Sequence, residues 1–230
     1  MAEINQLAHL GIIMDGNRRW AKNNGLASLV GHRKGYEKMK EVASWCIEAG
    51  VKVLTVYAFS TENWNRSEYE VKYLMDLFRL VLKNDLAKLA EQGIRVNVIG
   101  QKERLDADIQ DLIAQAEIKT KNNQRLIFNL AISYGGRPEI IQAVKKIIDQ
   151  KIAIEKIDED LIKKFLWTDG LPDPDLIIRT SGEHRLSNFL TWQSVYSELL
   201  FIDKHWPDFS QADLQQAIEV FNNRQRRYGK

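Results

Sequence analysis

The sequence predicts an α/β fold, in which a single domain holds a central, mostly parallel β-sheet of about six strands flanked by helices. Two observations predict it. Short apolar runs alternate with longer amphipathic segments along the whole chain, and this alternation is typical of a parallel sheet. No linker, internal repeat or low-complexity segment interrupts the 230 residues, a length that suits one domain. We therefore expect one domain over residues 1–230, with residues 1–8 as a flexible N-terminus.

Five apolar runs are expected to form strands. The run at 9–14 meets the turn-forming residues 15–17, an Asp-Gly-Asn sequence. Residues 51–59 are rich in Val, Thr, Tyr and Phe, the residues that strands favour. Further strands are predicted at 94–99, 125–132 and 175–179, and the stretch 189–202 is predicted to mix strand and helix.

Amphipathic periodicity predicts the helices. Along residues 68–92, apolar side chains recur every three or four positions, and Gly93 ends the pattern. Gly50 ends the preceding helix in the same way, and Ser210 with Asp213 resembles a capping box that opens the last helix. The helices are expected at 31–50, 68–92, 102–120, 138–150, 158–166 and 210–227, with a polar loop at 60–67.

Composition excludes several classes of protein. The 33 Lys and Arg residues nearly balance 31 Asp and Glu residues, so no nucleic-acid partner is expected. The single cysteine, Cys46, excludes a disulfide framework and a cysteine zinc site. No secretory signal or run of ~20 apolar residues is visible, which favours a cytoplasmic protein. A basic tail could still touch an anionic membrane surface at its periphery; it comprises Arg224, Arg226, Arg227 and Lys230.

The chemically distinctive residues follow three of the predicted strands. In open α/β sheets, ligands bind outside the carboxyl ends of the strands. This rule selects residues 15–20, 60–66 and 179–188, which are also rich in charged, hydroxyl and amide side chains. No P-loop, Gly-x-Gly-x-x-Gly or Gly-x-Ser-x-Gly motif occurs, which argues against the enzymes that use them.

The first loop has the composition of a phosphate site. Gly16 lets the backbone approach a ligand closely, and a helix start after it would offer free N–H groups to an anion. Five cations follow Asp15 without an intervening acid. The alternative interpretation is an ordinary Asp-Gly turn followed by solvated cations. These cations are Arg18, Arg19, Lys22, Arg33 and Lys34.

The other two loops combine hydroxyls, amides and arginines. Residues 60–66 could be a polar connector with one packed tryptophan, but loops at strand ends often carry function. Residues 179–187 hold two arginines and three hydroxyls, which suits phosphate; the alternative is a surface turn with a Glu183–Arg185 pair. Mg²⁺ takes one or two protein carboxylates and completes its shell with phosphate and water. Asp15 and Glu198 therefore indicate a diphosphate ligand with Mg²⁺.

In this order, the loops resemble those of the cis-prenyltransferase family. The resemblance runs from about His9 to Tyr228, and several long motifs carry it. They are HLGIIMDGNRRWA at 9–21, GH at 31–32, YAFSTENWNR at 57–66, NLA at 129–131, YGGR at 134–137, IRTSGEHRLSNF at 178–189, WQ at 192–193, YSEL at 196–199 and WPDF at 206–209.

The resemblance implies a homodimeric, Mg²⁺-dependent enzyme. Such an enzyme adds isopentenyl diphosphate in cis to farnesyl diphosphate and makes a long-chain polyprenyl diphosphate, such as the undecaprenyl diphosphate of the cell-wall lipid carrier. A shorter-chain synthase is the alternative. A non-catalytic partner subunit is disfavoured, because such subunits lose residues that are all present here: Asp15, Arg19, Arg179 and Arg185.

The resemblance also implies a role for each matching residue. Asp15 would hold Mg²⁺ and assist departure of the allylic diphosphate, Asn63 would act in proton removal, and Glu198 would be the second Mg²⁺ carboxylate. The allylic diphosphate would bind Gly16, Asn17, Arg18, Arg19, Trp20 and His32. Ser60, Thr61, Glu62, Trp64 and Arg66 would form a mobile substrate loop, and isopentenyl diphosphate would bind Arg179, Arg185, Leu186 and Ser187.

One position departs from the family pattern, and one feature concerns product length. Ser28 stands where the family usually has an arginine that helps to bind the substrate diphosphate. The growing product needs an apolar tunnel, expected between the sheet and the 68–92 helix. The resemblance places Ala58 and Leu126 along it, and the small Ala58 favours a long product. The alternative is that both residues are plain core.

Overall fold

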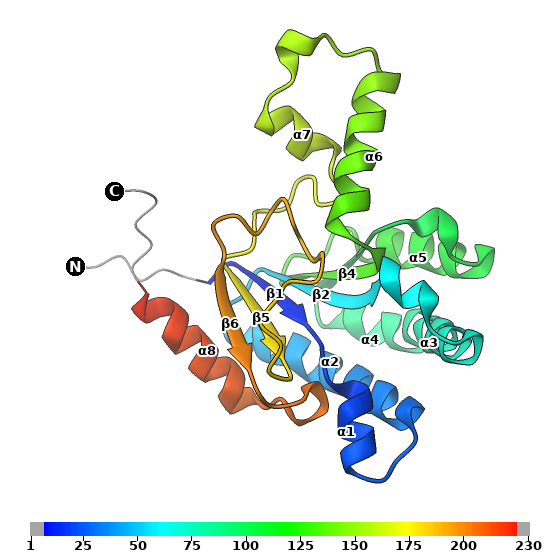
Figure 1. The fold of residues 1–230 in the computed structure, drawn as a ribbon, viewed down its shortest axis with the longest axis vertical. Coiled ribbons are helices and arrows are strands. Elements are labelled where there is room, and N and C mark those ends of the chain that lie inside the picture. Colours follow the sequence, from blue (N-terminus) through cyan, green and yellow to red (C-terminus); the bar gives the residue numbers. More distant parts are fainter. Residues whose placement is uncertain (1–6, 225–230) are drawn as a thin grey trace.

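The computed structural model describes residues 7–224 and contains one six-stranded, fully parallel sheet of order β3-β4-β2-β1-β5-β6 (Figure 1). This arrangement confirms the predicted single α/β domain. The strands are β1 (His9–Ile13), β2 (Val53–Ser60), β3 (Ile94–Ile99), β4 (Leu126–Tyr134), β5 (Leu176–Thr180) and β6 (Glu198–Ile202). The last of these is the strand within the stretch predicted as mixed.

The helices match the amphipathic segments, but three of them begin two or more residues away from the predicted start. α2 begins at Ser28 rather than at 31, α5 at Ala107 rather than at 102, and α6 at Gly136 rather than at 138. The predicted 68–92 helix also contains a π-helical turn at Val81–Asp85, between α3 (Glu68–Leu80) and α4 (Leu86–Glu91). The others are α1 (Asn17–Asn23), α2 (Ser28–Glu48), α5 (Ala107–Thr120), α6 (Gly136–Asp149), α7 (Glu159–Phe165) and α8 (Gln211–Asn223).

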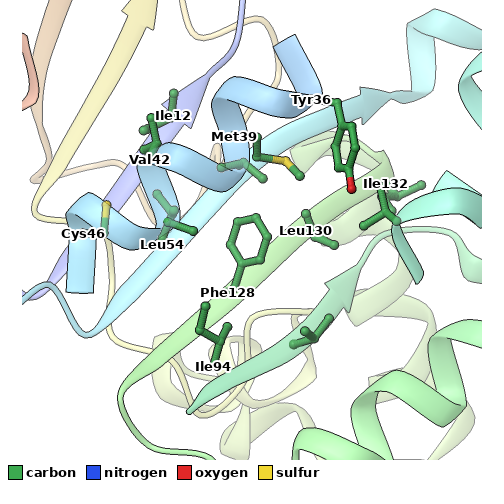
Figure 2. Close-up of a cluster of buried hydrophobic side chains, with 14 of the residues drawn as sticks. Ile12, Tyr36, Met39, Val42, Cys46, Leu54, Ile94, Phe128, Leu130 and Ile132 are labelled. Atoms are coloured by element: carbon green, nitrogen blue, oxygen red, sulfur yellow. The ribbon is translucent and has the colours of Figure 1, made fainter. Parts of the chain in front are cut away.

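Apolar side chains fill both faces of the sheet. On one face, the main core joins the strands to α2, α3, α5 and α8. Figure 2 shows part of it, with side chains of α2 meeting those of β1, β2 and β4. A smaller cluster on the other face includes Tyr134, Phe189 and Leu190. Figure 1 shows α6 and α7 projecting from this body as a pair.

A row of polar side chains, buried except for the half-buried Asn97, crosses the sheet. His9 is only 1 % exposed, with its Nδ1 2.7 Å from the carbonyl oxygen of Pro172 and its Nε2 2.8 Å from Thr55 Oγ1. Asn129 donates to Thr55 Oγ1, and Asn97 donates to Asn129 Oδ1. Because a carbonyl only accepts, Nδ1 carries the hydrogen and Nε2 accepts from Thr55. Burial lowers the pKa of His9 to about 4.

Residues 7 and 8 of the predicted flexible N-terminus are part of the folded structure. Of the segment 1–8, residues 1–6 lie outside the described part, whereas Leu7 is buried and the Ala8 amide donates to Asp175. Of the basic tail, only Arg224 lies within the described residues. No helix among residues 7–224 is both long enough and apolar enough to cross a membrane.

The strand order places the three selected loops side by side. Residues 15–20 follow β1, residues 60–66 follow β2 and residues 181–188 follow β5, and these are neighbouring strands at the centre of the sheet. Because all strands are parallel, the three loops leave the same edge of the sheet. The fold thus gathers at one place the segments that the sequence motifs identified.

Candidate active site

Two adjoining cavities open at this edge. One has a volume of about 700 Å³ and lies over α1 and the start of α2. The other, of about 530 Å³, lies between the loops after β2 and β5. Both are lined by Met14, Asp15, Asn17, His32 and Arg66, so the two cavities meet at these five residues. Two adjoining cavities of this kind can hold two ligands in contact with each other.

Asp15 stands where the cavities meet, between two arginines. Its Oδ1 lies 3.1 Å from Arg19 Nη2, and its Oδ2 lies 2.9 Å from Arg179 Nη2. Burial alone would raise the pKa of Asp15, but the hydrogen bonds from Arg179 and Arg19 outweigh it and hold the pKa below its ordinary value. Asp15 is therefore an ionised carboxylate at neutral pH.

Gly16 is required by the turn that follows Asp15. Its φ of +101° lies in the left-handed region, where side chains are strained. A Cβ at this position would lie 2.6 Å from Ser181 Oγ and 2.8 Å from His205 Nδ1. Ser181 Oγ and His205 Nδ1, which are 2.6 Å apart, thus pack against one side of the turn. Gly16 also lines the larger cavity.

Arg179 organises the loop after β5 while it binds Asp15. Its side chain is 6 % exposed, and its Nη1 donates to the Arg185 carbonyl at 2.6 Å and to Ser187 Oγ at 2.7 Å. One planar guanidinium therefore connects β1 to the 185–187 backbone. A lysine could not make these divergent bonds, because it has a single charged nitrogen.

A second acid, Glu70 of α3, binds one histidine and two arginines; burial lowers the pKa of that histidine, His32, below its ordinary value. Its Oε1 lies 3.0 Å from His32 Nε2 and 2.9 Å from Arg66 Nη1, and Arg18 approaches its Oε2 at 3.6 Å. Burial alone would raise the pKa of Glu70. The interactions with His32 and Arg66 outweigh burial, so the pKa lies below its ordinary value and the carboxylate is ionised. The sequence prediction missed Glu70, because Arg66 lies before the start of α3 and no helical spacing links the two residues.

The loop after β2 is a 3₁₀ turn, Thr61–Asn65, rather than an irregular loop. Asn63 Oδ1 accepts from the Ser60 amide at 3.1 Å, in a capping box. Trp64 turns inward, where its Nε1 donates to Ser133 Oγ at 3.0 Å and its ring meets Phe59 edge-on. Ser60, Glu62, Asn63 and Arg66 line the smaller cavity.

Asn188 is another residue that the sequence prediction did not assign. Its amide nitrogen donates to Glu62 Oε1 at 3.1 Å, and its Oδ1 accepts from the Arg137 amide at 2.8 Å. Its carbonyl accepts from the Gly136 amide at 2.7 Å. Asn188 thus links the loops after β2, β4 and β5, and it also lines the smaller cavity.

The remaining predicted residues differ in where they lie. Ser28, Arg18 and Arg19 line the larger cavity, and Ser187 lines the smaller one. Trp20 instead donates to Asp208 at 2.7 Å, Arg185 pairs with Glu183, and Leu186 packs against the smaller apolar cluster.

Glu198 lies at the opposite edge of the sheet. It is the first residue of β6 and pairs with Leu176, whereas Arg179 near the site pairs with Phe201 three residues further along. Three residues of strand span about 10 Å. The Glu198 carboxylate is bound by Arg224. A single chain therefore does not bring Glu198 to Asp15, because a strand separates its first residue from the loop at its end.

Comparison with known proteins identifies the family. A family model described as putative undecaprenyl diphosphate synthase matches residues 13–229. An isoprenyl transferase of Clostridium perfringens is 48 % identical over 225 residues, covering 96 % of this chain and 89 % of the relative. An undecaprenyl diphosphate synthase of Pyrococcus abyssi, named as geranylgeranyl-diphosphate specific, is 47 % identical over 96 % of this chain and 86 % of its own length.

Solved structures agree with the sequence relatives. A lavandulyl diphosphate synthase from Lavandula x intermedia, in complex with dimethylallyl diphosphate, superposes with a TM-score of 0.94 at 38 % identity, covering 98 % of this chain and 99 % of the other. A probable undecaprenyl diphosphate synthase of Campylobacter jejuni gives 0.83 at 35 % identity, covering 98 % and 100 %.

With this fold and this cation-lined edge, the protein is a prenyl transferase. More narrowly, the chain belongs to the undecaprenyl diphosphate synthase family of prenyltransferases, as its motifs predicted.

Proposed function

We propose that this enzyme is an Mg²⁺-dependent cis-prenyltransferase, which condenses isopentenyl diphosphate with an allylic diphosphate. Farnesyl diphosphate is the proposed primer and undecaprenyl diphosphate, for the cell-wall lipid carrier, the proposed product. One observation carries the proposal: an ionised Asp15 stands at the junction of two cavities that are lined by arginines from the carboxyl ends of three neighbouring strands, β1, β2 and β5.

The two cavities suit two different diphosphates. The larger one, with Gly16, Arg18 and Arg19, would take the allylic diphosphate; Gly16 and the start of α1 leave room for its oxygens. The smaller one, with Arg179 and Ser187, would take isopentenyl diphosphate. Since the cavities share Asp15 and Asn17, the allylic carbon of one substrate would face the double bond of the other.

The charges of the site favour the bond that must break. When the allylic C1–O bond cleaves, its electron pair passes to the diphosphate, and the isopentenyl double bond attacks the allylic carbon. Preorganised arginines stabilise the charge that develops on the leaving diphosphate. The attack leaves positive charge on the isopentenyl C3, so a proton is then lost from C2 and the electron pair of that C–H bond forms the new C2=C3 double bond. A neutral amide is a poor base, so we assign Asn63 to orienting the diphosphate that accepts this proton.

The residues of this edge fit Mg²⁺. Within residues 7–224, no group of three or more His, Cys, Asp or Glu side chains could hold a metal unaided. Mg²⁺ needs only one or two carboxylates when phosphate oxygens complete its shell, and Asp15 stands beside the proposed diphosphate site. When bound, Mg²⁺ would neutralise diphosphate charge. Glu198 could serve as the second carboxylate only through a second copy of the chain, and we therefore include in the proposal the homodimer that the family resemblance implies.

A shorter-chain cis-prenyl synthase is a second candidate, and one observation favours it. The apolar cavity beneath the site has a volume of only about 60 Å³. A non-catalytic partner subunit is disfavoured, since Asp15, Arg19 and Arg179 are present and hydrogen-bonded at the site. Peripheral membrane contact through the basic tail stays a prediction, which salt-sensitive liposome binding would test.

The decisive experiment measures product masses. Purified protein is incubated with labelled isopentenyl diphosphate, Mg²⁺ and farnesyl or geranyl diphosphate, with and without a chelator. Chelator-sensitive polyprenyl products support the proposal, and their length separates the two candidates. Asp15→Ala should abolish product, while the matched Asp160→Ala, at an exposed position on α7, should not. Absence of product from every primer would contradict the proposed function.

A further inference from the structure

Tyr36 occupies an unusual position for a polar residue. It lies on the inner face of α2 and is 8 % exposed, and Figure 2 shows its ring hanging over Leu130 and Ile132 of β4. Its hydroxyl is buried without a hydrogen-bond partner among the described residues. A buried hydroxyl without a partner is unfavourable, so no hydrogen bond holds the Tyr36 ring in this position.

The Tyr36 side chain forms part of the wall of the small apolar cavity. Met39, Ala58, Leu74, Phe78 and Leu130 line the same cavity. Its upper end is formed by Met14, Asn17 and His32, which also line the cavities proposed for the diphosphates. The apolar cavity therefore begins where an allylic diphosphate would leave its hydrocarbon tail, and it runs down between α2, α3 and the sheet.

The volume of this cavity is too small for the proposed primer. An apolar cavity of about 150 Å³ holds one benzene molecule, and this one measures about 60 Å³. A fifteen-carbon farnesyl tail can therefore enter only if a side chain that lines the cavity moves aside. Ala58 cannot yield space, because its side chain is a single methyl group.

The other aromatic residues of the wall are held in place. The Trp206 indole donates to the Gly35 carbonyl at 2.8 Å and stacks on Phe209. Phe78 packs edge-on against the buried Phe59. Tyr36 has no such hydrogen bond; the Lys40 ammonium lies 4.6 Å from the centre of its ring. Swinging Tyr36 aside breaks no hydrogen bond that the described residues make.

We infer that Tyr36 is the residue that determines how long a prenyl chain this enzyme accepts and makes. The inference rests on the proposed function, because it assigns the apolar cavity to the prenyl tail. With Tyr36 in place, chains beyond the first isoprene units enter only when the ring moves. Without the phenol ring, the cavity extends further between α2 and β4, so longer tails bind and products grow longer.

The test is a size series at this position, Tyr36→Ala, Tyr36→Leu, Tyr36→Phe and Tyr36→Trp. Two quantities are measured for each: the product mass distribution, and the dissociation constants of geranyl, farnesyl and geranylgeranyl diphosphate. Tyr69→Ala is the matched control, since Tyr69 is 73 % exposed on α3. Circular dichroism identifies any variant that fails to fold, and Tyr36→Leu replaces Tyr36→Ala in that case.

We expect Tyr36→Ala and Tyr36→Leu to lengthen the product by at least one isoprene unit, and Tyr36→Trp to shorten it. Tyr36→Phe and Tyr69→Ala should match the wild type. The affinity of Tyr36→Ala for geranylgeranyl relative to geranyl diphosphate should rise about tenfold or more, since each further buried methylene contributes a factor of about four.

Two results would overturn the inference. One is a product distribution that does not change with the size of the side chain at position 36. The other is an unchanged ratio of affinities across the three diphosphates. If the wild type makes no product from any primer, the proposed function fails, and the affinity ratio alone then decides the role of Tyr36.

Discussion

Replacing His9 should reduce the amount of folding stability that the protein loses when the pH is lowered from 7.5 to 4. The folded protein holds His9 neutral between Pro172 and Thr55, and burial lowers its pKa to about 4. In the unfolded chain the pKa is 6.5. As the pH falls, His9 takes up a proton in the unfolded chain before it does so in the folded protein, and this favours unfolding. The stabilisation that the neutral, buried His9 gives the fold is therefore fully present above pH 6.5 and is lost as the pH falls toward 4. The pKa difference corresponds to about 3 kcal/mol.

Urea unfolding monitored by circular dichroism, between pH 7.5 and pH 4, measures this loss. His9→Gln should be less stable than the wild type at pH 7.5, yet it should lose about 3 kcal/mol less on acidification. His184→Gln, at an exposed position, should follow the wild type. Parallel pH profiles for the wild type and His9→Gln would refute the reasoning, because they would show that His9 does not titrate differently in the two states.

Three further substitutions test the active site. Ser28 lines the larger cavity at the start of α2, so Ser28→Arg should lower the KM for the allylic substrate by roughly tenfold or more, as one charged hydrogen bond of about 1.5–3 kcal/mol would; an unchanged or raised KM contradicts this. Asn63→Ala should lower kcat much more than it weakens isopentenyl diphosphate binding, and unchanged turnover would exclude a catalytic role. Ala58→Leu should shorten the product, because Ala58 lines the apolar cavity; an identical mass distribution would show that this position is plain core.

Helix and strand positions were predictable where a local pattern sets them. The strand at 51–59 and the helix at 68–92 were found because their apolar side chains recur with the period of each structure. The start of α2 was misplaced by three residues, since no side chain caps it and Ala27 simply adopts an extended backbone. The π-helical turn at 81–85 was not predictable, because its Val81 and Leu82 follow the packing of the core rather than a local signal.

The tunnel shows the same division between pattern and packing. The family resemblance placed Ala58 and Leu126 along it. In the structure Ala58 lines the apolar cavity, while Leu126 lies at the beginning of β4 in the main core and does not line that cavity. Tyr36 fits the helical pattern of the buried residues of α2, and this pattern does not distinguish it from ordinary core. Only its position over β4, beside Ala58 and Leu74, makes it a candidate for controlling length.

The sequence by itself determined the family, the parallel sheet and the three loops that carry the site. It could do so because each motif directly follows a strand whose pattern is local. Only the tertiary structure decided which side chains meet. The strand order brings Arg179 to Asp15, and helix packing brings Glu70 to His32. It also leaves Glu198 at the far edge, because Glu198 begins its strand rather than following it. Contacts between residues far apart in the chain depend on strand order and packing, which no local pattern specifies.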